Sequence, residues 1–464
     1  METKNITLEH NKGNMVSYGL GGLGREFLKM AFDTYVFFYY ETEIGLNVWW
    51  IGLALIIFAI YNAINDPLIG YLTNREFKFT KKWGRRFPLI LLGGIPMGLC
   101  YFLMFTPPNV SPQSNPLVLF FWLLIIAILY DTFHSLFFVN YQSLFPDKFR
   151  SAEERRSVTS ITVPLGVLGV ALGAILPPLF ITYENLQSYA IQGIVALVFT
   201  IFMMFLSIPG IKEDPKAIEQ YLQKAKEEKD RDTFLESMKK ALTQRSFISF
   251  VILYTLYCAT TVSMTSSISY VVRFILEMEA NATTLLMAGM LVGTLISSPF
   301  WVKFAKKTDN NRQVMIIASL LMSVLTIPFI FLESYILLII AISIWGVSLG
   351  AFWVMLFPVM SDIIDESIVR HGQREEGTYT GIQQFFGRLG SIIQVLSFAI
   401  IHTLTGFVEG SSTQTDLALT GIHIHLGIVP MVAMLIGGLI FWKFYDLTPE
   451  RTQSNQQIIR EKNL

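Results

Sequence analysis

The chain has 464 residues, of which 52% are hydrophobic and 15% charged, and its 35 Lys and Arg residues balance 35 Asp and Glu residues. This apolar composition excludes an ordinary soluble enzyme, and a net charge of zero gives no indication of a nucleic-acid partner. The two cysteines, Cys100 and Cys258, lie in apolar stretches and provide neither a disulfide framework nor metal-ligand spacing. We therefore expect an all-α membrane protein without a metal or cofactor.

Twelve apolar stretches are long enough to cross a bilayer as helices, which takes about 20 residues each. In chain order they are 16–41, 47–73, 87–106, 117–145, 157–183, 190–209, 247–276, 283–305, 313–332, 335–361, 378–404 and 421–444. The polar residues 1–15 have no apolar core, so no cleavable signal peptide is predicted. All Lys and Arg residues except Arg25, Lys29, Arg273 and Arg388 lie near the chain ends or in alternate turns. This distribution predicts that both termini are cytoplasmic.

A charge-rich stretch divides the twelve helices into two sets of six. We predict an N-terminal six-helix bundle at 1–209, a cytoplasmic linker at 210–246, a C-terminal six-helix bundle at 247–445 and a cytoplasmic tail at 446–464. This order resembles the major facilitator superfamily, in which two related bundles hold a substrate site near the bilayer midplane. We expect a monomer in the plasma membrane whose partners are lipid and a small organic solute.

The first helix carries charge in an apolar setting. Its stretch 19–33 begins with the G-x-G-x-x-G spacing of dinucleotide sites, but no buried strand precedes it, and that interpretation is rejected. Arg25, Glu26, Lys29 and Asp33 fall within one arc of about 100° on a helix. A charge at mid-bilayer costs roughly 2.5 to 3.5 kcal/mol, so these side chains must face protein or water. They form either a neutral internal network or part of a solute site.

The second helix contains a compact set of oxygen-bearing side chains. Asn62, Asn65 and Asp66 occupy positions i, i+3 and i+4, which places them on one helix face. Oxygen ligands around one carboxylate suit a small hard cation, and a desolvated carboxyl suits a proton equally well. The alternative is that Asp66 forms an ion pair with Arg388 or Lys29.

Four segments resemble one known family. YGLGGLGREF, NAINDPLIGYL, WGRRFPLI and SDIIDESIVRHGQREEG are similar to the glycoside-pentoside-hexuronide:cation symporters, the melibiose permease-like branch of the major facilitator superfamily. The resemblance implies Na⁺- or H⁺-coupled symport, with an amide at Asn62 where the family has an acid. It also implies a cation site made from Asn62, Asn65, Asp66, Ser135 and Arg388.

The resemblance departs from the family at the solute site. Glu26 matches the first sugar-binding acid, but Phe138 replaces the second, and the partner arginine of that acid falls near Ile161 or Thr162. Asp131 lies seven residues before Phe138 on the same helical face and is a candidate replacement. The predicted solute contacts are Arg25, Glu26, Lys29, Asp131 and Phe138. The more apolar cavity leaves three alternatives: a sugar or glycoside-like solute, a lysolipid or other amphipathic solute, and an uncoupled receptor or scaffold.

The cytoplasmic turns contain candidates for a gate. The resemblance implies ion pairs among Arg85, Arg86, Arg155, Asp362, Asp365, Arg374 and Glu376. Exposed ion pairs contribute about 0 to 1 kcal/mol each, so a gate needs several of them and can reopen. The alternative is that the basic residues only orient the chain in the membrane. His134 and His402 have no third ligand at a spacing that would make a metal site. The sequence also contains no nucleophile and base at a spacing that would indicate an enzyme.

Overall fold

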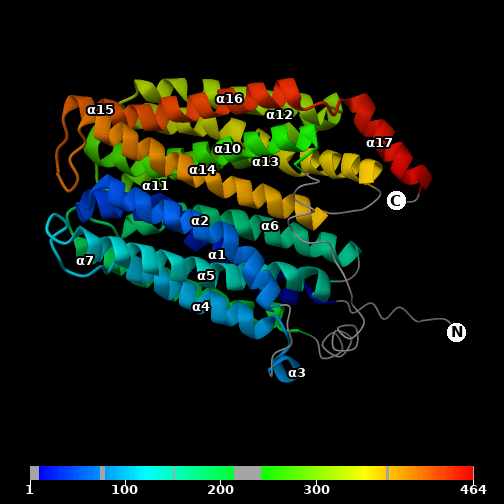
Figure 1. Cartoon of the computed structure of the whole chain (residues 1–464), viewed down its shortest axis with the longest axis horizontal. Coiled ribbons are helices and arrows are strands. Elements are labelled where there is room, and N and C mark those ends of the chain that lie inside the picture. The colour runs from blue at the N-terminus through cyan, green and yellow to red at the C-terminus, as the bar shows by residue number, and fades with distance from the viewer. Residues whose placement is uncertain (1–9, 74–78, 150–151, 214–241, 372–375, 463–464) are drawn as a thin grey trace. The chain divides into compact units, whose positions relative to one another are not determined.

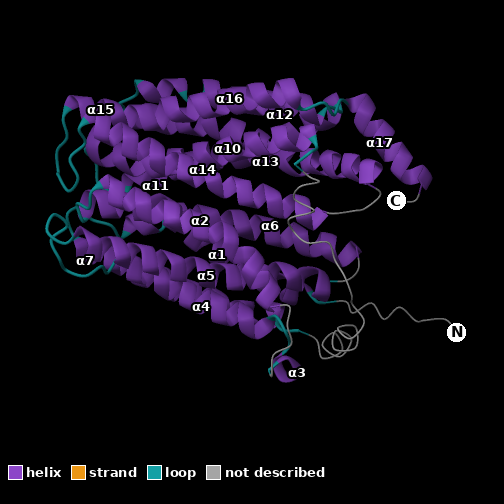
Figure 2. Cartoon of the chain, in the orientation of Figure 1, coloured by secondary structure: helices purple, strands orange, loops and turns teal. Residues whose placement is uncertain are grey.

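The computed structural model describes residues 10–73, 79–149, 152–213, 242–371 and 376–462. The chain forms two units, Met1–Asp230 and Arg231–Leu464. The division falls within the predicted linker 210–246, of which 214–241 lie outside the described residues. Every regular element in the described part of the chain is a helix (Figures 1 and 2).

The first unit contains six long helices. They are α1 (Lys12–Phe38), α2 (Val48–Thr73), α4 (Phe87–Met104), α5 (Pro116–Lys148), α6 (Ala152–Ile175) and α7 (Leu186–Ile211). Shorter elements join them: a π-helical turn at Tyr39–Glu43, α3 (Thr80–Trp83) and a 3₁₀ turn at Pro177–Leu179. Asn185 caps the start of α7 by accepting hydrogen bonds from the backbone of Gln187 and Ser188, so this helix begins at a polar turn.

The second unit repeats this order and adds a helix at its end. Its long helices are α10 (Arg245–Tyr270), α11 (Ala282–Thr308), α12 (Asn311–Val324), α13 (Tyr335–His371), α14 (Glu376–Thr405), α15 (Asp416–His423) with α16 (Val429–Phe444), and α17 (Pro449–Lys462). π-Helical turns lie at Val271–Ile275 and Ile424–Ile428, and a 3₁₀ turn lies at Ile327–Ile330. The predicted tail 446–464 therefore contains a helix, α17, which packs against α13.

Eleven helical segments of the described chain are long and apolar enough to cross a membrane. The first predicted span corresponds to α1, which is 27 residues long and is not one of these eleven segments. It contains too many charged residues to count as apolar, namely Arg25, Glu26, Lys29 and Asp33. With α1 as the twelfth long helix, the predicted all-α fold of two six-helix bundles is confirmed.

Helix pairing follows the same pattern in both units. In the first, α1 packs against α6 and α7, α2 against α5, and α4 against α5 and α7. In the second, α10 packs against α14 and α16, α11 against α13, and α12 against α13 and α16. The first helix of each unit also ends in a π-helical turn. This correspondence is the internal repeat that many transporter folds contain.

Two glycines allow α1 to pack directly on the backbone of α6. A Cβ atom at Gly169 would lie 2.4 Å from the backbone oxygen of Leu23, and one at Gly173 would lie 2.3 Å from that of Phe27. Small residues at such crossings allow membrane helices to approach closely. The contact fixes α1 at the turn that carries Arg25 and Glu26.

Candidate cation and solute site

The four charged residues of α1 form two neutral pairs. The Arg25 guanidinium contacts the Glu26 carboxylate, and Lys29 Nζ lies 2.7 Å from Asp33 Oδ2, one turn further along the helix. Each pair joins one basic and one acidic side chain, so the helix carries no net charge at this level. Pairing reduces the cost of placing ionised groups in a membrane. The predicted alternatives, an internal network and a solute site, are both compatible with these contacts.

Helix α5 holds Arg25 in place from the side. Arg25 Nε donates to His134 Nε2 at 3.1 Å, and the guanidinium carbon lies 4.0 Å from the centre of the Phe138 ring. Phe138, His134 and Tyr130 follow one another at four-residue spacing and stack with ring centres 5.9 and 6.2 Å apart. The aromatic face attracts the cation, so Phe138 helps to position the Arg25 guanidinium.

A second polar cluster lies between α2 and α5. Ser135 Oγ donates to Asp66 Oδ1, which joins two of the residues predicted for the cation site. Asn62 Nδ2 donates to Asp131 Oδ1, and Asn65 Nδ2 lies 3.0 Å from Asp131 Oδ2. All three α2 residues therefore contact α5, as their shared helix face predicts. We call Asn62, Asn65, Asp66, Asp131 and Ser135 the α2–α5 cluster.

Asp131 lies in the α2–α5 cluster, although the sequence suggested it as a solute contact. It is 1% exposed, and both asparagine amides donate to it. His134 and Phe138, one and two turns further along α5, are turned toward Arg25 on α1. Asp131 and Phe138 point within about 20° of each other, because they are seven residues apart. One broad face of α5 therefore meets both α2, through Asp131, and α1, through Phe138.

Lys29 and Arg388 are the two basic residues considered as partners of Asp66. Lys29 forms its ion pair with Asp33. Arg388 lies half-buried on α14, in the second unit. Ser135 donates a hydrogen bond to Asp66, and the assignment of Asp66, Ser135 and Arg388 to a cation site remains a prediction.

The predicted gating residues of the first unit hold helix ends together. Arg85 forms an ion pair with Asp147 at 3.3 Å, and Arg86 donates to Asn140 Oδ1 at 3.1 Å. Arg155 Nε donates to the backbone oxygen of Phe149 at 2.7 Å. These contacts lie within the first unit and join the neighbouring ends of α4, α5 and α6.

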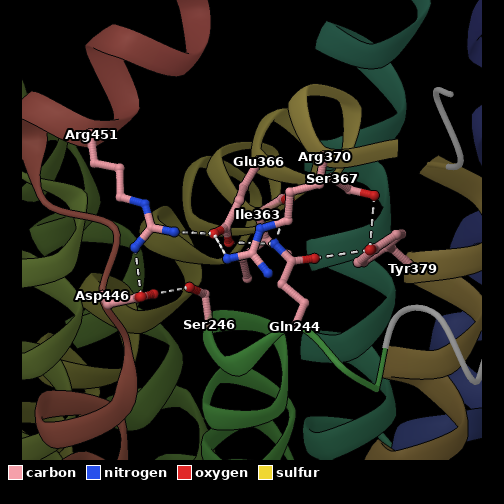
Figure 3. Close-up of polar contacts among 9 residues, drawn as sticks. All are labelled: Gln244, Ser246, Ile363, Glu366, Ser367, Arg370, Tyr379, Asp446 and Arg451. Atoms are coloured by element: carbon pink, nitrogen blue, oxygen red, sulfur yellow. Dashed lines mark hydrogen bonds and ion pairs between the residues drawn. The ribbon is translucent and has the colours of Figure 1, made fainter. Parts of the chain in front are cut away.

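The corresponding end of the second unit centres on Glu366 (Figure 3). Glu366 is 2% exposed and accepts from Gln244 Nε2 at 2.6 Å, from Arg370 and from Arg451 of α17 at 2.6 Å. Tyr379 of α14 donates to Gln244 Oε1 at 2.9 Å. The cluster joins α10, α13, α14 and α17 through one buried carboxylate.

Arg451 extends this cluster to Asp446, which also accepts from the Ser246 hydroxyl. Burial acts to raise the pKa of Asp446, but the hydrogen bonds from Ser246 and Arg451 outweigh it and the pKa is lowered. Sequence analysis did not identify this tie between the tail and the bundle, because no local pattern connects residues 200 positions apart.

The predicted gating residues of the second unit lie on α13 and beyond it. Asp362 accepts from Asn311 Nδ2 at 2.9 Å, and Asp365 directly precedes Glu366 near the end of α13. Arg374 lies outside the described residues, as does the side chain of Glu376. Among the residues that the structure describes, no group of three or more His, Cys, Asp or Glu could hold a metal ion.

Comparison with known proteins identifies the family. The family model described as MFS/sugar transport protein matches residues 17–449. The chain belongs to this family. It is therefore an integral membrane transport protein of the major facilitator superfamily, and the predicted resemblance to its symporters is confirmed.

Relatives in this family include transporters of different solutes. A sodium-dependent lysophosphatidylcholine symporter 1-B of Danio rerio is 21% identical over 96% of this chain and 89% of the relative. A lactose permease of Lactobacillus delbrueckii subsp. bulgaricus is 22% identical over 94% of this chain and 70% of the relative. The solved structure of a D-xylose-proton symporter covers 94% of this chain and 98% of that one, with 14% identity and a TM-score of 0.62. At this identity the structural likeness establishes the fold alone.

Within this family fold, sequence analysis missed one residue that contacts the predicted solute site. His134 was treated as a lone membrane histidine, but it accepts from Arg25 and stacks between Tyr130 and Phe138. The signal was present as three rings at four-residue spacing on α5. It became meaningful only once α5 was placed beside Arg25.

Proposed function

We propose that the protein is a secondary active symporter that moves an organic solute with Na⁺ or H⁺ by alternating access. The observation that carries this proposal is the hydrogen bond from Ser135 to Asp66 at the centre of the α2–α5 cluster. It joins two residues that were assigned to the cation site separately, on different helices. Both termini and the charged turns are proposed to face the cytoplasm.

Cation binding at Asp66 gives the proposed site its coupling function. A carboxylate in an apolar bundle is costly when it is ionised, and a bound Na⁺ or proton relieves that cost. The cation then favours the state that binds solute, and solute must tighten cation binding by the same factor because coupling is reciprocal. Ser135 and the amides of Asn62 and Asn65 are neutral groups that orient the carboxylates without replacing the ion.

Solute binding is assigned to the α1 face beside α5. Glu26 is partly exposed, with 27% of its side chain accessible, and the paired Arg25 keeps its charge balanced. A carboxylate with a neighbouring guanidinium can bind sugar hydroxyls as acceptor and donor. Lys29 is half exposed and extends this polar surface by one turn. A sugar or glycoside-like solute is therefore the first candidate, in agreement with the sugar-transport family.

A lysolipid or another amphipathic solute is the second candidate. The aromatic ring of Phe138 beneath Arg25 favours it, because the ring supplies an apolar surface next to a fixed positive charge. Relatives named as lysophosphatidylcholine symporters support the same possibility. A zwitterionic headgroup with an acyl chain would use both features.

The proposed gate consists of polar contacts at the cytoplasmic ends. Arg85, Arg86, Arg155, Asp362 and Asp365 are the described members of this set. The partly exposed ion pair between Arg85 and Asp147 is worth about 0 to 1 kcal/mol and can break and reform during transport. The present contacts of the set within each unit would keep the helix ends intact while the bundles rearrange.

Uptake into proteoliposomes tests the proposal. Vesicles that contain the purified protein receive labelled glycosides, pentoses, uronic acids and lysolipids under an inward Na⁺ gradient or a pH gradient, each imposed separately. Accumulation of one solute above its external concentration under one gradient supports symport and names the ion. Equilibration at the same rate with and without either gradient contradicts coupling.

A further inference from the structure

We infer that Asp131 is the second carboxylate of the cation site and determines its affinity for the coupling ion. This inference rests on the proposed symport function and deepens it. It changes the role that the sequence suggested for Asp131, from solute contact to cation ligand or cation-positioning group.

Three hydrogen bonds join Asp131 to α2. Asn62 Nδ2 donates to one carboxylate oxygen, and Asn65 Nδ2 donates to the other at 3.0 Å. Asn65 also lies 3.3 Å from the backbone oxygen of Asp131. Two donors from one helix, one on each oxygen, fix the plane of the carboxylate. Its position is therefore set by the same helix turn that carries Asp66.

Ser135 completes the connection from the other direction. It lies one turn after Asp131 on α5, and its hydroxyl donates to Asp66. The two carboxylates are thus linked twice: through Ser135 along α5, and through Asn62 and Asn65 along α2. Asp131, Asn65 and Ser135 are each no more than 1% exposed. The result is a compact, buried arrangement made from adjacent turns of two helices.

The hydrogen-bond donors in this arrangement are neutral. Amide and hydroxyl groups stabilise a carboxylate without cancelling its charge, whereas a bound cation does both. Two carboxylates held close together repel each other, and a cation or proton between or beside them relieves the repulsion. Removing the charge of Asp131 should therefore weaken ion binding even if Asp66 is unchanged. Two acids with neutral oxygens suit a monovalent ion better than Ca²⁺, which takes six to eight oxygen ligands.

The solute face of α5 is distinct from this arrangement. His134 and Phe138 contact Arg25 on α1, whereas Asp131 and Ser135 contact α2. A change at Asp131 should therefore alter ion binding measured in the absence of solute. If Asp131 bound solute instead, its change would alter solute affinity and leave the solute-free ion response as it was.

Ion-dependent protection of the full-length protein in detergent tests this inference without solute. The unfolding temperature is measured against NaCl concentration, with choline chloride keeping the ionic strength constant, and against pH without Na⁺. An ion that binds the folded protein raises this temperature as its concentration increases. The variants are Asp131→Asn, the exchange variant Asn62→Asp/Asp131→Asn, and the control Thr132→Ala. Thr132 donates to the backbone of Ile128 and contacts Tyr61 at 2.8 Å on the same helix interface, but contacts neither carboxylate.

We expect Asp131→Asn to raise the Na⁺ concentration at half-maximal protection by roughly 10- to 100-fold, the range typical of lost groups around bound metal ions. The matching result for a proton-coupled protein is loss of the pH-dependent step. The exchange variant should recover the response, because it returns a carboxylate to the same pair of helix turns, and Thr132→Ala should keep it. If Asp131→Asn cannot be purified in a folded state, the exchange variant decides by itself: a restored response supports the inference and a missing one overturns it.

Two negative results have different meanings. A wild-type protein that responds to neither ion, and whose vesicles show no gradient-driven uptake, overturns the proposed function together with this inference. A wild-type protein that responds, with an Asp131→Asn variant whose half-maximal concentration is unchanged, overturns the inference alone. In that case an altered solute KM would return Asp131 to the solute site.

Discussion

The direct packing of α1 on α6 predicts a sharp difference between two glycine substitutions on one helix. In Gly169→Ala the new Cβ would lie 2.4 Å from the backbone oxygen of Leu23 and 3.1 Å from Glu26 Cβ, and real Cβ atoms essentially never approach below 3.0 Å. Because the nearest atom belongs to the backbone, a rotamer change cannot relieve the clash. In Gly166→Ala, one turn earlier, the nearest atom is Glu26 Cγ at 4.0 Å, an ordinary contact.

The expected energies follow from this geometry. Both substitutions gain roughly 0.5 to 1 kcal/mol from replacing glycine within a helix, so that gain cancels in the comparison. Overpacking then costs Gly169→Ala about 1 to 3 kcal/mol, or more if α1 cannot move. Since the strained turn carries Glu26, we also expect a raised KM for solute in Gly169→Ala and an unchanged KM in Gly166→Ala.

A thiol-reactive fluorogenic dye provides the assay, because Cys100 is buried and Cys258 is half-buried, and unfolding exposes both. Gly169→Ala should unfold at a lower temperature than wild type, and Gly166→Ala at the same or a higher temperature. Equal unfolding temperatures and equal KM values for the two variants would refute the account of the α1–α6 contact.

Further predictions concern the solute face, the cation cluster and the C-terminal tie. Glu26→Gln should raise the solute KM while solute-free ion protection stays unchanged; an unchanged KM would count against the solute assignment. Ser135→Ala should weaken ion protection about tenfold, the lower part of the range for groups around a metal ion, and an unaltered Na⁺ titration would argue otherwise. Arg451→Ala should cost about 1 to 3 kcal/mol in unfolding measurements. That is less than the 3 to 5 kcal/mol of a broken buried pair, because Glu366 keeps Gln244 and Arg370. The lowered pKa of Asp446 stabilises the fold above its unfolded pKa of about 3.9, and this stabilisation is lost as pH falls through the folded pKa. Protease protection of α17 should therefore persist at pH 5 and decrease only in stronger acid.

Hydropathy was sufficient to predict the helices of this fold. Each apolar stretch must form its own backbone hydrogen bonds in a bilayer, so its length alone predicts a spanning helix. Helix α1 is the exception, because it contains four charged residues. Their position on one arc of the helix predicted that they face protein or water and not lipid. The structure confirms the all-α fold and describes two pairs, Arg25 with Glu26 and Lys29 with Asp33.

The neighbours of each residue could be predicted only in part. The spacing of Asn62, Asn65 and Asp66 indicated a shared face, and that face does meet α5. The same reasoning placed Asp131 on the face of Phe138, yet the two side chains contact different helices. Periodicity gives the direction of a side chain from its own helix axis and not the identity of the helix it meets.

The tie at Glu366 shows what sequence patterns cannot supply. Gln244 and Arg451 are far apart in the chain, and each is an ordinary polar residue beside a predicted membrane segment. Only tertiary packing brings them to the same buried carboxylate. The turn residues Arg85 and Arg86 were predicted to lie on the cytoplasmic side, but their contacts with Asp147 and Asn140 likewise required the packed bundle.

The measurement that tests the central claim most directly compares wild type with Asp66→Asn in proteoliposomes under an imposed gradient of the ion that protects the wild type. The account predicts that wild-type vesicles accumulate the solute above its external concentration and that Asp66→Asn vesicles bring it only to equilibrium. Concentrative uptake by Asp66→Asn, driven by the same gradient to the same level, would contradict the assignment of Asp66 as the coupling carboxylate.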